Sequence, residues 1–91
     1  MRPDDPDGLV RDIGRQVAEL RAARGWTQEQ FADRLGVTPG YLGRLERGSQ
    51  SFTVHRLAWL ARALHVRVVD LFAPPRSRDV RIGRPSKTRS P

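Results

Sequence analysis

The strongest constraint on the fold is the segment TQEQFADRLGVTPGYLGRLERG, which carries the start signals of two helices. Thr27 is a good N-cap, and Gln30 stands three residues later, as in a capping box. Thr38 is a second N-cap, and Pro39 follows it at the first helical position, where a missing N–H costs nothing. Gly36 suits the left-handed residue that ends a helix. The segment therefore predicts two short helices joined by a three-residue turn.

Two helices connected in this way form a helix-turn-helix, in which the second helix can enter the major groove of DNA. Small or apolar side chains stand where the two helices have to pack, namely Phe31, Ala32, Leu35, Leu42 and Leu45. The segment thus favours DNA binding as the function of the chain.

The charge of the chain suits a polyanionic partner. The formal net charge is +7, with ten arginines against six acids over residues 9–72. Residues 1–8 have one arginine and three aspartates, whereas residues 73–91 have six Lys or Arg and one aspartate. A basic body with a basic tail is typical of nucleic-acid-binding proteins. Lysine occurs only once, so GC-rich codon usage is an alternative explanation for part of the arginine excess.

Several function classes lack the residues that they need. The sequence has no cysteine and its two histidines, His55 and His65, are isolated, so neither a metal site nor another cofactor is expected. No nucleophile–base pair or phosphate-binding glycine loop indicates an enzyme, and no catalytic residue is predicted. No apolar run approaches the roughly 18–20 residues of a membrane span. The N-terminal MRPDDPDG is no signal peptide, so the expected location is the cytoplasm, on nucleoid DNA.

Apolar periodicity and stop residues divide the chain into helical segments, expected at 9–24, 28–35, 39–47, 54–64 and 68–72. In the fourth segment the residues expected to be buried are Val54, Leu57, Ala58, Ala61 and Leu64. Four apolar pairs flank helix starts as hydrophobic staples: Trp26/Phe31, Val37/Leu42, Phe52/Leu57 and Val66/Leu71. The sequence predicts an all-α domain over residues 9–73, between a disordered N-terminal arm (1–8) and a disordered basic tail (74–91).

The chain resembles the phage-repressor-like helix-turn-helix family (Cro/Xre type) in three segments, TQEQFA, GVTPGYLGRLERG and LARALHVRVVDLF. The resemblance covers about residues 9–72. It implies a compact five-helix DNA-binding domain whose third helix, residues 39–47, reads the major groove. Members are mostly small bacterial and phage transcription regulators, so the resemblance also implies double-stranded DNA as the partner.

The resemblance further implies which residues touch DNA. Gln28 matches a glutamine that contacts the phosphate backbone beside the recognition helix. Arg44 has the chemistry to bond O6 and N7 of guanine, with a phosphate contact or a solvated position as alternatives. Tyr41 can reach a thymine methyl or a phosphate. The exposed recognition-helix positions are Thr38, Pro39, Gly40, Tyr41, Gly43 and Arg44, and the secondary phosphate candidates after them are Arg47, Ser49 and Gln50.

The chain departs from the commoner pattern of the family, which often has Gln or Ser where Pro39, Gly40 and Gly43 stand. These three residues offer no side-chain hydrogen bond to a base, so we expect sparse direct readout and a larger contribution from DNA shape. Arg21 and Glu46 match a partly buried ion pair between the first and third helices, so a structural role is expected of them.

Two further features have more than one interpretation. Trp59 stands at the edge of the fourth helix's apolar stripe, where it either packs in the domain or faces a partner. Arg81-Ile82-Gly83-Arg84-Pro85 resembles an interrupted AT-hook. Minor-groove insertion, non-specific phosphate attraction and no role at all are the interpretations of this segment.

The sequence thus predicts a sequence-specific DNA-binding transcription regulator, a repressor that forms a homodimer through its fourth and fifth helices. Two half-sites one helical turn apart would raise the affinity of a small domain that buries little DNA surface. The alternative is a protein-interaction module, such as the antitoxin of a toxin–antitoxin pair or an adaptor.

Overall fold

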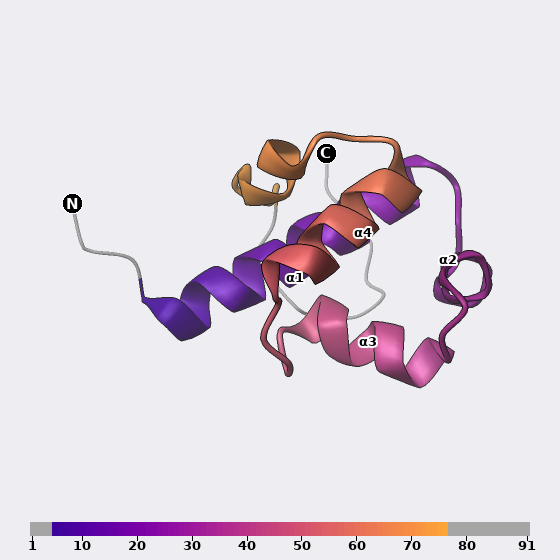
Figure 1. Ribbon diagram of the computed structural model, residues 1–91, viewed down its shortest axis with the longest axis horizontal. Coiled ribbons are helices and arrows are strands. Elements are labelled where there is room, and N and C mark those ends of the chain that lie inside the picture. Colours follow the sequence, from indigo (N-terminus) through magenta and orange to yellow (C-terminus); the bar gives the residue numbers. More distant parts are fainter. Residues whose placement is uncertain (1–4, 77–91) are drawn as a thin grey trace, which may run out of the picture.

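The computed structural model describes residues 5–76, and within this range every regular element is a helix. The elements are α1 (Pro6–Ala23), α2 (Gln28–Leu35), α3 (Pro39–Arg47), α4 (Val54–Leu64) and the 3-10 helix η1 (Val68–Phe72). Figure 1 shows α1 crossing the molecule behind α4, with α3 along one edge and η1 at the opposite edge. The predicted all-α fold is confirmed, and its last helix is a 3-10 turn.

The core lies where α1, α3, α4 and η1 meet, and α2 closes it at one end. Its fully enclosed large side chains are Val17, Phe31, Leu42, Leu45, Leu60, Leu64 and Leu71. Burying a leucine or phenylalanine of this kind contributes about 1.5–3 kcal/mol. Trp26 stacks on Phe31 with ring centroids 5.5 Å apart and planes 16° apart, so the predicted staple at the start of α2 is formed.

The predicted turn between α2 and α3 is present with its capping residues. The Thr27 hydroxyl accepts the Gln30 N–H at 3.0 Å, and the Gln30 side chain accepts the Thr27 N–H at 2.9 Å. Gly36 ends α2 with a φ of 76°, a left-handed conformation that favours glycine. Thr38 then caps α3 by accepting the Tyr41 N–H at 3.1 Å. These local bonds fix where α3 begins.

The first helix begins earlier than the predicted Leu9. Pro6 occupies its first turn, and the Asp5 carboxylate accepts the Gly8 N–H at 3.1 Å as the N-cap. Asp-Pro is a helix start signal, because aspartate caps and proline tolerates the first helical position. Part of the predicted disordered arm, 1–8, is therefore helical from Pro6 on.

The chain stays packed on the body slightly beyond the predicted end of the domain. Pro75 is buried, and the Arg76 N–H donates to the Glu19 carboxylate of α1 at 2.9 Å. The predicted disordered tail thus cannot begin at residue 74. The segment Arg81-Ile82-Gly83-Arg84-Pro85 lies outside the described residues.

The buried stripe of α4 also differs from the prediction. Val54 is 79% exposed and Ala58 is exposed, whereas Leu60 is fully buried. The observed stripe is Leu57, Leu60, Ala61 and Leu64. This set follows the i, i+3, i+4, i+7 spacing of one helix face, and the prediction had started that face one turn too early.

A close crossing of α1 and α3, which the sequence analysis did not foresee, sets the position of α3. A Cβ on Gly14 of α1 would lie 2.5 Å from the Leu45 carbonyl oxygen and 2.6 Å from that of Glu46. Gly48, at a φ of 74°, ends α3 against the backbone of Arg11 in α1. Only glycine at position 14 allows the two backbones to approach this closely.

Candidate nucleic-acid interface

The outward face of α3 is the candidate site. Figure 1 shows α3 along the edge of the molecule. Of the predicted contact residues, Thr38, Pro39, Gly40, Arg44 and Arg47 are exposed, and Tyr41 is half-buried. The first turn of α3 has no acidic residue and its last turn has Arg44 and Arg47. The C-terminal half of this face is therefore cationic. Its N-terminal half has Pro39 and Gly40, which have no polar side chain.

Other kinds of site are not visible between residues 5 and 76. No three His, Cys, Asp or Glu side chains in this range lie close enough together to hold a metal ion. In the same part of the chain, no helix has the length and apolar character needed to cross a membrane.

A hydrogen-bonded group of three side chains ties α3 to α1 and α2. Arg21 donates from Nε to Glu46 at 2.7 Å and from Nη2 to the other carboxylate oxygen at 3.2 Å. Its Nη1 donates to the Trp26 carbonyl at 2.7 Å. Gln28 donates from Nε2 to Glu46 at 2.8 Å. We call Arg21, Gln28 and Glu46 the anchor network; it contains the predicted ion pair.

Burial makes the anchor network a strong one. The Glu46 side chain is 4% exposed and the Arg21 side chain 15%. A bidentate arginine–carboxylate pair is both stronger and more directional than a neutral hydrogen bond, particularly away from water. The network therefore fixes the orientation of α3 relative to the scaffold. The sequence pattern matched Arg21 with Glu46 but gave no sign that Gln28 joins them, because the third contact depends on how α2 sits against α3.

Gly43 does not belong to the exposed face, contrary to the prediction. It is buried, and a Cβ on it would lie 3.1 Å from Arg47 Nη1 and 3.9 Å from Gln28 Nε2. The side chains of Arg47 and Gln28 therefore cover this position. The family resemblance placed Gly43 on the exposed face, but a residue without a side chain is readily covered by its longer neighbours.

The first residues of the loop after α3 complete the end of the helix through a backbone hydrogen bond. The Ser49 N–H donates to the Arg44 carbonyl at 2.9 Å, which closes the C-terminus of α3 beyond Gly48. Ser49 is exposed and Gln50 is half-buried. The exposed Ser49 thus follows the exposed Arg47 after Gly48, at the C-terminal end of α3.

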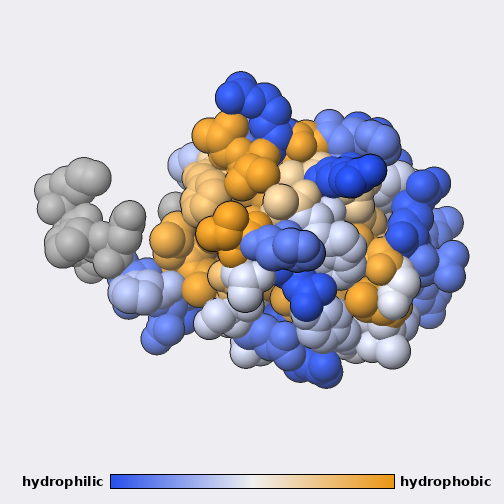
Figure 2. Space-filling view, in the orientation of Figure 1, coloured by the Kyte–Doolittle hydropathy of each residue, from blue (hydrophilic) through white to orange (hydrophobic). Residues whose placement is uncertain are grey.

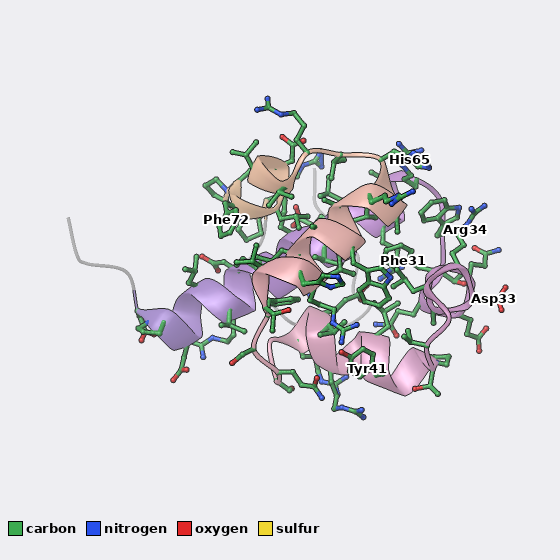
Figure 3. All side chains as sticks on the ribbon, viewed as in Figure 1. Phe31, Asp33, Arg34, Tyr41, His65 and Phe72 are labelled. Atoms are coloured by element: carbon green, nitrogen blue, oxygen red, sulfur yellow. The ribbon has the colours of Figure 1, made fainter. Side chains whose placement is uncertain are left out.

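Sequence reasoning missed one residue that the structure brings to this face. Arg56 of α4 lies over the ring of Tyr41, with its guanidinium carbon 5.6 Å from the ring centroid. Arg44 lies at the same distance of 5.6 Å from that ring. Figure 3 shows Tyr41 on α3, beneath α4. No short-range spacing links residues 41 and 56, so only the packing of α4 on α3 reveals the contact.

Known proteins are similar to this chain in sequence and in fold. The helix-turn-helix family HTH_3 matches residues 17–71. The competence pilus inhibition repressor of Acinetobacter baylyi is 39% identical over 61 residues, which are 67% of this chain and 56% of that protein. The chain thus spans little more than half the length of that relative.

Two solved structures are similar over about two thirds or more of this chain. The restriction-modification controller protein C.AhdI from Aeromonas hydrophila has a TM-score of 0.68 and 32% identity, over 76% of this chain and all of that one. The biofilm master regulator SinR, crystallised in complex with DNA, has a TM-score of 0.60 and 27% identity. That match covers 67% of this chain and 98% of SinR.

The described elements form a helix-turn-helix domain with an outward-facing α3. The family match covers more than half of the chain and ends within η1. The chain belongs to the HTH_3 family of helix-turn-helix proteins.

Proposed function

We propose that this protein regulates transcription by binding double-stranded DNA, with α3 in the major groove. The observation that carries the proposal is an exposed helix held rigidly by the anchor network, with Arg44 and Arg47 on its outer side. Rigid positioning matters because preorganised groups bind without a further ordering cost. The similarity to SinR, whose structure contains DNA, supports the same mode of binding.

Each predicted DNA-contact residue has a role in this proposal. Arg44 reads guanine, because its guanidinium is exposed and can bond O6 and N7 together. Tyr41 contacts a thymine methyl or a phosphate. Gln28 uses one amide N–H on Glu46, which leaves its second N–H for a phosphate. Backbone and side-chain phosphate contacts come from the residues around them, Thr38, Arg47, Ser49 and Gln50.

Direct readout in this proposal is sparse. Pro39 and Gly40 offer no side-chain hydrogen bond, and Gly43 is covered by its neighbours. Fewer base contacts leave more of the specificity to the shape and deformability of the site. We therefore expect a short conserved core in each half-site, flanked by positions that prefer a DNA shape.

A homodimer completes the proposal. Figure 2 shows an apolar surface over η1, which includes Val68 (38% exposed), Val69 (55%) and Phe72 (47%). Figure 3 shows Phe72 pointing away from the body of the domain. A second copy that covers this surface would place two recognition helices on successive half-sites. The protein would then act as a repressor in the cytoplasm, on nucleoid DNA.

Selection from a random duplex library tests the proposal. We expect an enriched, two-fold symmetric motif whose binding weakens steeply with salt, since each neutralised phosphate contributes about −0.9 to the slope of log K against log salt. An enriched motif without symmetry would leave DNA binding in place and remove the homodimer. If no motif is enriched and binding to duplex is weak at low salt, the proposed function is wrong.

The apolar surface over η1 also favours a second candidate function, the binding of another protein. Val69 and Phe72 could instead cover a different protein, as in an antitoxin or an adaptor. The sequence analysis associated a partner surface with Trp59, but that residue is half-buried and packs against the core. Sedimentation of the purified protein separates the two functions: a dimer that Val69→Asp dissociates favours the regulator, and a stable monomer favours the module.

A further inference from the structure

A stacked row of rings and guanidinium groups joins α4 to the recognition helix. The Arg56 guanidinium lies 4.6 Å from the Trp59 ring centroid and 5.6 Å from the Tyr41 ring centroid. The Arg44 guanidinium lies 5.6 Å from the same tyrosine ring. We propose that Arg56 is a positioning residue for sequence readout, which holds Tyr41, and through it Arg44, in the orientation that meets DNA. The inference rests on the proposed function.

The Tyr41 ring lies near two guanidinium groups, that of Arg44 on its own helix and that of Arg56 on α4. A half-buried tyrosine on a helix surface can populate more than one rotamer, and DNA would have to select one of them. Guanidinium groups beside the ring restrict this choice before DNA arrives.

The position of Arg56 is itself well fixed. Its backbone N–H donates to the Thr53 hydroxyl at 2.9 Å, as part of the N-terminal cap of α4. Its guanidinium rests on Trp59, which packs against the hydrophobic core. The row therefore starts at the rigid part of the domain and ends at Arg44 on the exposed face.

The planarity of the side chain matters for this role. A guanidinium group is flat and can lie against aromatic rings, whereas a lysine ammonium is a compact, strongly hydrated point charge. A contact of the Arg56–Tyr41 kind changes an equilibrium about 2- to 5-fold at a partly exposed site. Charge alone is thus not enough, and Arg56→Lys should lose the positioning effect.

The experiment compares binding to the selected duplex with binding to single-base variants of it. We expect Arg56→Gln and Arg56→Lys to lower the ratio of these affinities about 2- to 5-fold. Arg62→Gln is the matched control, because it removes the same charge from an exposed residue of α4. In a Tyr41→Leu background, Arg56→Gln should have no further effect on the ratio.

Fluorescence supplies a readout in the free protein. The chain has two tryptophans, so Trp26→Phe leaves Trp59 as the reporter. In that background, Arg56→Gln should change the Trp59 emission, because it removes the guanidinium that lies 4.6 Å from the ring centroid. Circular dichroism confirms that each variant is folded.

Any one of the following outcomes overturns the inference. If Arg56→Gln weakens binding to all duplexes equally, Arg56 is a phosphate contact. If Arg56→Lys keeps the full ratio of affinities for the selected duplex and its single-base variants, stacking is not needed. If the wild-type protein selects a sequence and the Arg56→Gln variant has the same ratio of affinities, this inference is wrong and the proposed function stands. If the wild-type protein selects no sequence, the proposed function fails first and the inference fails with it.

Discussion

The two ends of α3 are built in different ways. At its C-terminal end, α3 is pressed onto α1, where a Cβ on Gly14 would come within 2.5 Å of the Leu45 carbonyl oxygen. The buried Glu46 carboxylate holds the same end. At its N-terminal end, a Cβ on Gly40 would meet nothing within 4 Å. Close packing thus fixes the axis of the helix at one end and leaves its other end bare and accessible.

The largest effect should come from the crowded end. Gly14→Ala places a methyl group against two backbone carbonyls, which cannot move aside as a flexible side chain could. We expect the free energy of unfolding to fall by about 3 kcal/mol, because a methyl group 2.5 Å from a backbone oxygen exceeds the usual overpacking cost of about 1–3 kcal/mol and alanine regains only about 1 kcal/mol in helix propensity. Urea denaturation measures it. An unchanged or raised stability would mean that α1 and α3 do not approach as closely as this.

Local signals in the sequence were enough to predict the open end of α3. Thr38 and Pro39 act within one turn of their own position, so the cap and the start of the helix follow from neighbouring residues. The Gly14 contact joins residues that are far apart in the chain, and no periodicity indicates it. Gly43 was misplaced for a related reason, because its burial depends on the rotamers of Arg47 and Gln28.

The next effect tests the anchor network at the crowded end. Glu46→Gln removes the charge from a buried group and leaves Arg21 without its ionic partner. We expect a loss of about 1–3 kcal/mol in the free energy of unfolding, as for hydrogen bonds to charged groups. The matched control is Arg21→Met, alone and combined with Glu46→Gln, in a thermal or urea cycle. Strictly additive losses would show that the two residues do not interact.

Substitutions on the exposed side of α3 should change DNA binding and leave the stability of the fold nearly unchanged. Arg44→Ala should leave the melting temperature nearly unchanged, because the residue is exposed. It should cost about 1–3 kcal/mol of discrimination at one base pair per half-site, if the guanidinium bonds guanine. Competition binding with single-base variants of the selected duplex measures this.

Gln28→Ala is the comparison for Arg44→Ala, since a phosphate contact weakens all sequences about equally. Part of its effect will be structural, because Gln28 also bonds Glu46. If Arg44→Ala also lowers affinity uniformly, then Arg44 contacts phosphate and base reading must come from another residue.

A smaller change in stability than at Gly14, and one of opposite sign, should come from the open end. Gly40→Ala adds a methyl group where nothing lies within 4 Å, so the free protein should gain up to about 1 kcal/mol of stability. Its DNA binding should nevertheless weaken, because glycine lets the helix backbone approach DNA more closely than alanine does. Thermal melting and binding to the selected duplex, measured on the same preparation, separate the two effects. A variant that is more stable and binds equally well would show that the bare end of α3 does not lie against DNA, and the contrast between the two ends would then concern folding alone.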